Sequence, residues 1–224
     1  MSHSDHPLDA TGVWCEIVTA VEPGRPALFL DRDGVVVEET DYLHRVEDIV
    51  MIDGAAAVIA AANARGIAVV LVTNQAGIGR GYYGWAAFAE VQRAIAARLA
   101  AQGAHLNAVY ACPHHPKGEG LFAHPDHPAR KPNPGMILQA ARDLALDLKP
   151  SWLVGDKAID VEAAKRAGLA GAMQVATGYG AAERDTAASL AAPGFEVRHG
   201  RSIADALTLP IMTLPIMTVA PRQG

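Results

Sequence analysis

Acidic side chains stand where two apolar runs of the chain end. Asp31 and Asp33 follow the run Pro26–Leu30, and Asp156 follows the run 151–154. Carboxylates gathered at one edge of a sheet repel one another, so their proximity is tolerable chiefly when a cation lies between them. Oxygen ligands favour a hard ion, and Mg²⁺ is the natural choice because it keeps waters and bridges carboxylates to a phosphate. These residues therefore predict a magnesium site.

The polar residues beside these acids are those that phosphoryl transfer requires. Thr73 and Asn74 end another apolar run and offer a hydroxyl and backbone N–H groups to phosphate oxygens, and a lysine ammonium would neutralise charge in the transition state. Asp31 would attack phosphorus and form an aspartyl phosphate. Asp33 would protonate the leaving alkoxide and then deprotonate the hydrolytic water. A single such acid is typical of a solvated loop end, so it is the joint occurrence at successive strand ends that indicates chemistry.

Apolar runs alternate along the chain with helical patterns. Strands are predicted over 26–30, 67–72, 107–111, 151–154 and 172–176, and helices over 54–65, 88–99, 134–146 and 159–167. Gly66 and Gly168 follow two of these helices where a left-handed cap is typical, and Asn133 is expected to cap a third. The alternation predicts an α/β fold with a doubly wound, mostly parallel, Rossmann-like sheet. Ligands of such sheets lie at the carboxyl ends of the strands.

Length and composition predict one globular domain with flanking segments. The chain has 224 residues, of which 50% are hydrophobic and 19% charged, and this composition excludes a disordered protein. We expect a phosphatase domain over 25–205, an N-terminal extension over 1–24 and a C-terminal tail over 206–224. In that tail Thr-Leu-Pro-Ile-Met occurs twice, and its prolines predict a frayed end.

Charge and cysteine content bound the partners and the compartment. A net charge of −5 makes nucleic acid a poor expectation as a partner. Two cysteines are too few for a disulfide framework, and neither a signal peptide nor a membrane-spanning run is visible. We therefore expect a cytoplasmic protein without a membrane contact, either a monomer or a small homo-oligomer.

Four ordered stretches within about residues 27–180 resemble the motifs of the haloacid dehalogenase-like phosphatases. They are Asp31-Arg-Asp-Gly-Val, Thr73-Asn-Gln, Arg130-Lys-Pro and Gly155-Asp-Lys-Ala-Ile-Asp160. Within that family the chain is most similar to the small histidinol-phosphate and heptose-bisphosphate phosphatases. The resemblance implies an Mg²⁺-dependent phosphomonoesterase that removes the 7-phosphate of a heptose 1,7-bisphosphate. Histidinol phosphate or another small sugar phosphate fits the same motifs.

The resemblance also implies a role for each matching residue. Asp31 would be the nucleophile, Asp33 the acid/base, and Thr73 and Lys131 the groups that stabilise the phosphoryl group. Asp31, Asp33 through its carbonyl, and Asp156 would hold Mg²⁺. The residues expected to contact substrate are Glu39, Thr40, Asp41, Tyr42, Asn74, Gln75, Arg130 and Lys157.

Other classes of protein fit the motifs less well. A phospho-acceptor signalling module shares the acidic pocket, but Asp33 would hydrolyse the acyl phosphate that such a module keeps. A nucleic-acid end-processing phosphatase would need a basic groove with stacking aromatics, and the chain is acidic with four Phe. Dehalogenation has no use for Asp156 and Lys131.

One loop departs from the subgroup. The subgroup commonly carries a structural zinc bound by Cys-x-His and then Cys-x-Cys, and here only the first half is present, as Cys112 and His114. The second half is replaced by a stretch with His124 and His127. Cys112, His114 and His127 are the candidate zinc ligands, and the alternative is a compact proline-rich loop without zinc. Only about 40 residues separate Asp31 from Thr73, so we expect no sizeable cap domain.

Overall fold

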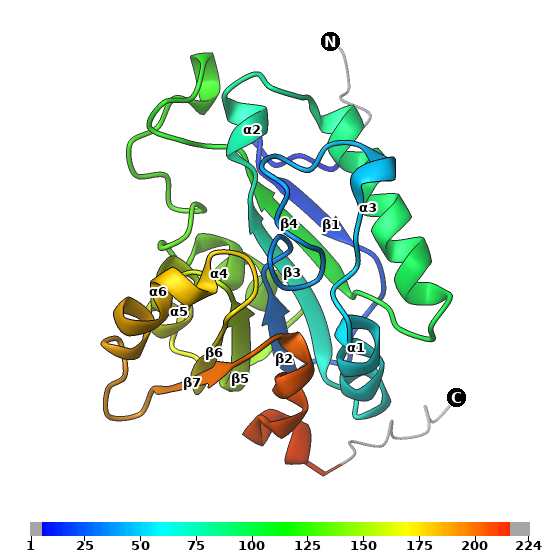
Figure 1. The fold of residues 1–224 in the computed structure, drawn as a ribbon, viewed down its shortest axis with the longest axis vertical. Helices are drawn as coiled ribbons and strands as arrows, with labels where there is room; N and C mark the ends of the chain where they lie inside the picture. The colour runs from blue at the N-terminus through cyan, green and yellow to red at the C-terminus, as the bar shows by residue number, and fades with distance from the viewer. Residues whose placement is uncertain (1–5, 216–224) are drawn as a thin grey trace.

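Seven strands form one sheet at the centre of the protein, in a computed structural model that describes residues 6–215 (Figure 1). The strand order is β1-β4-β3-β2-β5-β6-β7. β1 runs antiparallel to β4, and all other neighbours are parallel. The strands are β1 (Trp14–Ile17), β2 (Pro26–Leu30), β3 (Ala68–Asn74), β4 (Ala108–Cys112), β5 (Asp147–Gly155), β6 (Gly171–Val175) and β7 (Glu196–Gly200).

Helices cover both faces of the sheet. They are α1 (Ala55–Ala64), α2 (Ala76–Gly79), α3 (Trp85–Ala100), α4 (Gly135–Asp143), α5 (Ala158–Ala167) and α6 (Gly180–Ala188). Figure 1 shows α1 and α3 on one side of the strands and α4, α5 and α6 on the other. Along β2, Leu28 and Leu30 pack with the first group, whereas Ala27 and Phe29 pack with the second. This alternation follows from the period of two in a strand, and it explains why the central strands read as continuous apolar runs.

The predicted α/β class and the mostly parallel sheet are confirmed. Gly66 and Gly168 have left-handed φ angles of 71° and 79°, as the cap prediction required. The predicted cap at Asn133 is wrong, because Pro134 takes that position and no side chain caps α4. The Asn133 amide instead donates to Asp126 and accepts from Arg166.

The packed unit extends beyond the expected domain at both ends. Trp14 is 3% exposed in β1, the antiparallel edge strand. After β7, the 3-10 helices Ile203–Thr208 and Pro210–Thr213 pack back onto the core, and Ile211 and Met212 are buried there. The expectation of a frayed end is therefore wrong for the first copy of the repeat, whose apolar side chains are covered. The second copy, residues 213–217, is described only as far as Pro215, and its last two residues lie outside the described part of the chain.

The connection from β2 to α1 leaves the site edge of the sheet open. Within it, the structure has only a single 3-10 turn, Val46–Asp48, and isolated bridges. The expected lack of a large cap is thus confirmed. None of the helices in residues 6–215 combines the length and the apolar character needed to cross a membrane.

Candidate active site

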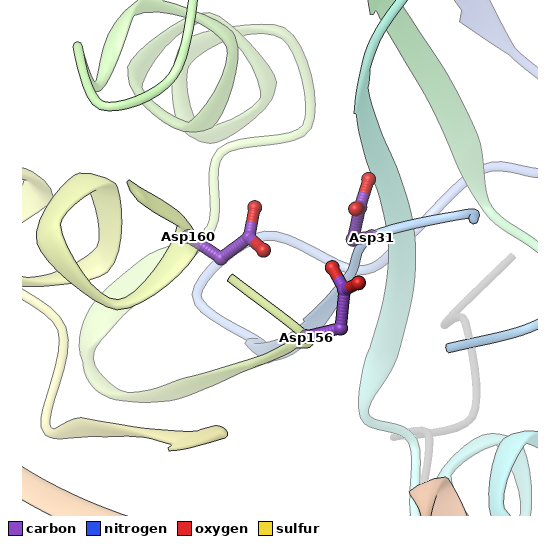
Figure 2. Close-up of side chains that lie close together, drawn as sticks. All are labelled: Asp31, Asp156 and Asp160. Atoms are coloured by element: carbon purple, nitrogen blue, oxygen red, sulfur yellow. The ribbon is translucent and has the colours of Figure 1, made fainter. Parts of the chain in front are cut away.

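Three carboxylates converge at the carboxyl ends of two neighbouring central strands. Asp31 follows β2 and Asp156 follows β5, and these strands pair in parallel with Leu30 opposite Val154. Asp160 lies in the first turn of α5, which begins just after Asp156. Their oxygens lie within 4.8 Å of one another, and no other such group of His, Cys, Asp or Glu occurs in residues 6–215. Figure 2 shows the three side chains pointing into a common space.

Asp156 is fully buried and only partly satisfied. Its Oδ2 accepts a hydrogen bond from the backbone N–H of Tyr179 at 2.8 Å, whereas its Oδ1 has no partner. Burial first, and then the charges of Asp31 and Asp160, raise the pKa of Asp156 to about 7. Gly34 has φ 80°, and a Cβ there would lie 2.8 Å from Asp156 Oδ2, so only glycine fits beside this carboxylate.

The carboxylate set fits Mg²⁺. A buried acceptor without a donor, among like charges, is stabilised by a hard cation and has no other partner in the described chain. Asp31, Asp156 and Asp160 are the side chains that would hold it. The carbonyl of Asp33 stays a predicted ligand.

Lys131 neutralises part of the same cluster. Its Nζ lies 2.8 Å from Asp31 Oδ1 and 2.6 Å from Asp160 Oδ1, and it donates to the carbonyl of Val72 at 2.8 Å. Burial alone would lower the pKa of Lys131, but Asp160 and Asp31 more than offset this, and the pKa lies above its ordinary value. The ammonium is therefore charged and fixed beside the predicted nucleophile.

Asn74 fixes the backbone of Lys131. The Asn74 Nδ2 donates to the Lys131 carbonyl at 3.0 Å, and the Lys131 N–H donates to Asn74 Oδ1 at 3.1 Å. Both polar atoms of the Asn74 amide are therefore bonded to the backbone of Lys131. The structure thus places Asn74 in the site, with its side chain turned to Lys131.

The predicted acid/base and the predicted hydroxyl are joined through Gln75. Gln75 Nε2 donates to Asp33 Oδ2 at 3.1 Å and to Thr73 Oγ1 at 2.8 Å. Gln75 is 2% exposed and Thr73 is 1% exposed. Because its Oε1 also accepts hydrogen bonds from Arg32 and Tyr83, the Gln75 amide is fully engaged within the protein.

A cavity of about 240 Å³ lies above these groups. Glu39 and Lys157 line it, with Lys157 Nζ 3.5 Å from Glu39 Oε2 and 4.1 Å from the ring centre of Tyr179. Arg130 also lines it, and its NH1 donates to the carbonyl of His114 at 2.9 Å. The other predicted contact residues that line it are Asp41, Tyr42, Asn74 and Gln75. Thr40 lines an adjoining cavity of about 810 Å³ instead.

The candidate zinc ligands do not converge. Within residues 6–215, Cys112, His114 and His127 form no group whose ligand atoms meet. Burial raises the pKa of the Cys112 thiol to about 12, whereas zinc binds a thiolate. His114 and His127 stack with ring centres 3.6 Å apart, and His114 Nε2 bonds to the carbonyl of Thr11. In the loop where the resemblance implies a structural zinc, the rings of His114 and His127 therefore stack on each other.

Three side chains at the site escaped the sequence prediction. Asp160 lies within the stretch Gly155–Asp160 without a predicted role, although its spacing of four from Asp156 was a usable signal, because it puts a second carboxylate in the first turn of α5. Arg32 lies between two acids in the sequence, and that spacing does not predict that its side chain turns into the interior. Tyr179 lines the cavity from a loop that carried no motif.

Known proteins resemble this chain in sequence and structure. A family model described as HAD-hydrolase-like matches residues 128–204. The D-glycero-beta-D-manno-heptose-1,7-bisphosphate 7-phosphatase of Mesorhizobium japonicum is 50% identical over 167 residues, 74% of this chain and 77% of the relative. The D-glycero-alpha-D-manno-heptose-1,7-bisphosphate 7-phosphatase of Burkholderia mallei is 40% identical over 82% of this chain and 94% of the relative.

Two crystal structures share the fold. A protein of Mesorhizobium loti described as a HAD-like phosphatase has a TM-score of 0.84 and 43% identity, covering 96% of this chain and 100% of its own. The D,D-heptose 1,7-bisphosphate phosphatase of B. bronchiseptica, complexed with magnesium and phosphate, has a TM-score of 0.71 and 30% identity. That match covers 81% of this chain and 95% of the bacterial enzyme.

Proposed function

This chain belongs to the haloacid dehalogenase-like hydrolases, among the heptose-1,7-bisphosphate 7-phosphatases, and on that premise we propose that it removes the 7-phosphate of D-glycero-D-manno-heptose 1,7-bisphosphate. It is a phosphoric monoester hydrolase. The observation that carries the proposal is the ammonium of Lys131 at 2.8 Å from Asp31 Oδ1, among acids that suit Mg²⁺. Cys15 and Cys112 are both free thiols, which fits a reducing compartment such as the cytoplasm.

The first half of the reaction transfers the phosphoryl group to the protein. An oxygen of Asp31 attacks phosphorus, the bond from phosphorus to the sugar oxygen breaks, and that oxygen takes a proton from Asp33. Lys131 and the Thr73 hydroxyl lie at the cavity to hold the transferring oxygens. The products of this half are the heptose 1-phosphate and an aspartyl phosphate.

The second half regenerates the carboxylate of Asp31. A water attacks the phosphorus, Asp33 accepts its proton, and the bond between Asp31 and phosphorus breaks to release inorganic phosphate. Mg²⁺, when bound by the acids, supplies positive charge that offsets their mutual repulsion and stabilises charge on the phosphoryl oxygens. The protein's own part is to orient the carboxylates and to keep Lys131 charged.

Arg130 suits the second phosphate of a bisphosphate. It lines the cavity from the loop that follows β4, and its NH1 is anchored by the carbonyl of His114. A planar guanidinium binds phosphate through two parallel hydrogen bonds. A substrate with a phosphate at each end would therefore be held at both.

Phosphate release tests the proposal. With Mg²⁺ present, both anomers of the heptose bisphosphate and histidinol phosphate are compared at matched concentrations, as ratios of kcat/KM. We expect a preference for one heptose anomer of about tenfold or more over histidinol phosphate, which has a single phosphate. The matched control is Arg130→Met, which should lower kcat/KM for the bisphosphate much more than for histidinol phosphate. A preference for histidinol phosphate would overturn the proposed substrate.

A further inference from the structure

Arg32 is a buried charge beside the active site. Its side chain is 1% exposed, and burying a guanidinium is costly unless the charge is paired. The chain places it between Asp31, which faces the carboxylate cluster, and Asp33, whose side chain is 16% exposed at the cavity. An apolar side chain could fill the same interior space, so the contacts of the Arg32 guanidinium must account for the presence of a charge there.

Those contacts converge on Asp33. Arg32 Nε donates to Asp33 Oδ1 at 3.0 Å and Oδ2 at 3.2 Å, and its NH2 lies 3.0 Å from Oδ1. Gln75 Nε2 adds a donor to Oδ2 at 3.1 Å. Both oxygens are therefore held from the protein side, which fixes the rotation of the carboxylate and leaves its outward face to the cavity.

The guanidinium is itself anchored to separate parts of the fold. Its NH2 donates to Gln75 Oε1 at 3.2 Å and to the carbonyl of Leu43 at 3.4 Å. Its Cζ lies 5.5 Å from the ring centre of Phe88, on α3. Tyr83 donates to Gln75 Oε1 at 2.5 Å and so locks the amide that meets Asp33. The donors to Asp33 are thus fixed by the strand end, the loop and a helix together.

We propose that Arg32, with Gln75, is a positioning residue for the acid/base Asp33, and that it aims the carboxyl group at the leaving oxygen. The inference rests on the proposed phosphatase function. It concerns the proton transfer to the sugar oxygen, because an orientation error of this carboxyl group affects that transfer first. Attack by Asp31 does not depend on it.

Comparing leaving groups separates positioning from a merely structural role. An alkyl ester needs a proton on its departing oxygen, whereas 4-nitrophenolate leaves without one. The alkyl substrate is whichever of heptose bisphosphate and histidinol phosphate the wild type hydrolyses faster, so the test survives an error in the proposed substrate. For Arg32→Met we expect kcat/KM on the alkyl ester to fall by about 100-fold and kcat/KM on 4-nitrophenyl phosphate to fall by less than about threefold. The constant kcat/KM reports only the steps up to release of the leaving group, so the second half of the reaction, in which Asp33 is the base for both esters, does not enter it.

Arg32→Lys is the conservative variant. Lysine keeps the positive charge but lacks the forked N–H donors of the guanidinium, so this variant should recover part of the activity lost on the alkyl ester. Arg98→Met is the matched control, because Arg98 is a half-buried arginine, bonded at 2.6 Å to the carbonyl of Ile49 and lying outside the cavity. Any change in Arg98→Met should be equal for the two esters.

Gln75→Met keeps the proposal open to refutation if Arg32→Met does not fold. It removes one donor to Asp33, and it should still raise the ratio of aryl to alkyl activity, on top of a common loss through Thr73. Equal losses of kcat/KM on both esters, in Arg32→Met or in a folded Gln75→Met, would overturn the positioning role and leave the phosphatase function standing. A wild type that hydrolyses 4-nitrophenyl phosphate and neither alkyl ester would overturn the proposed substrate and the role in protonating an alkyl leaving group, and a wild type that hydrolyses none of the three would overturn the phosphatase function as well.

Discussion

Two polar clusters of this molecule differ in how they are completed. The carboxylate cluster consists of Asp31, Asp156 and Asp160, and the histidine cluster of His114, His124 and His127. In the first, like charges are gathered and a buried oxygen of Asp156 has no donor. In the second, the rings pack on one another, and burial lowers the pKa of His127 to about 4, so the ring is neutral at neutral pH.

The protonation preferences of the two clusters separate a metal site from a packed polar cluster. Burial raises the pKa of Asp156 and lowers that of His127, and in each case the isolated fold favours the uncharged form. For the acids, protonation relieves the mutual repulsion of the carboxylates only in part, and a bound cation would offset the rest. For the histidines, ring stacking and backbone hydrogen bonds to His114 Nε2 and His127 Nδ1 engage most of the set, and among their buried ring nitrogens only His114 Nδ1 lacks a hydrogen-bond partner in the described chain.

The largest effect is expected from the nucleophile. Asp31→Asn keeps the shape of the side chain but removes the attacking carboxylate, so kcat should fall by about four orders of magnitude or more. The fold should remain intact, because neutralising one of three clustered acids relieves repulsion. Phosphate release and a thermal melt measure the two effects. Substantial retained activity would show that another group attacks phosphorus.

Metal dependence should follow the carboxylate cluster alone. Stripping the protein with EDTA should reduce phosphate release to background, and Mg²⁺ alone should restore it fully. Added Zn²⁺ should not be needed, since the Cys112 thiol is buried and protonated. Metal content of the purified protein is the second readout. One equivalent of tightly held zinc, removed together with activity, would contradict the contrast between the clusters.

The bounds of strands are predicted best from the sequence where the strand is buried on both faces. Strand 26–30 was predicted with its observed bounds, because a central parallel strand is apolar on both faces. β1 and β7 were missed, since each lies at an edge of the sheet and is half-exposed and mixed in composition. Ile211 and Met212 show the reverse case, in which a short apolar segment with prolines packs through tertiary contacts that its local sequence does not encode.

For the site, residue type was predictable and side-chain direction was not. The residues Asp31, Asp33, Asp156 and Lys131 could be found because strand order brings them to one edge. Asn74 and Gln75 were expected to face substrate, yet their amides hold Lys131, Asp33 and Thr73. An amide bonds to whichever partner the packed chain presents, and that partner comes from a distant strand or loop.

The two clusters should respond to pH with opposite signs. In metal-free protein, Asp156 has a folded pKa of about 7 against an ordinary value near 4, so its contribution to stability grows as pH falls from about 7 to 4. His127 has a folded pKa of about 4 against about 6.5, so its contribution is lost over the range from about 6.5 to 4. Melting temperatures of wild type, Asp156→Asn and His127→Gln between pH 5 and 8 measure both.

Asp156→Asn should melt above the wild type at pH 8 and lose that advantage toward pH 5. His127→Gln should improve relative to the wild type as pH falls. Adding Mg²⁺ should cancel the advantage of Asp156→Asn, because an ion favours the ionised carboxylate, and should leave the trend of His127→Gln unchanged. Parallel trends in the two variants would remove the electrostatic distinction between the clusters.

The smallest effect concerns what the histidine cluster does for the site. The carbonyl of His114 anchors Arg130, and the ring of His114 is held by stacking on His127. His127→Ala removes that ring and should loosen the anchor without touching the carboxylates. KM for the bisphosphate should then rise by about two- to fivefold, with kcat unchanged. With 4-nitrophenyl phosphate, which has no second phosphate, neither constant should change. A drop in kcat for both esters would mean that the loop shapes the reacting centre itself, and the two clusters would then act as one unit.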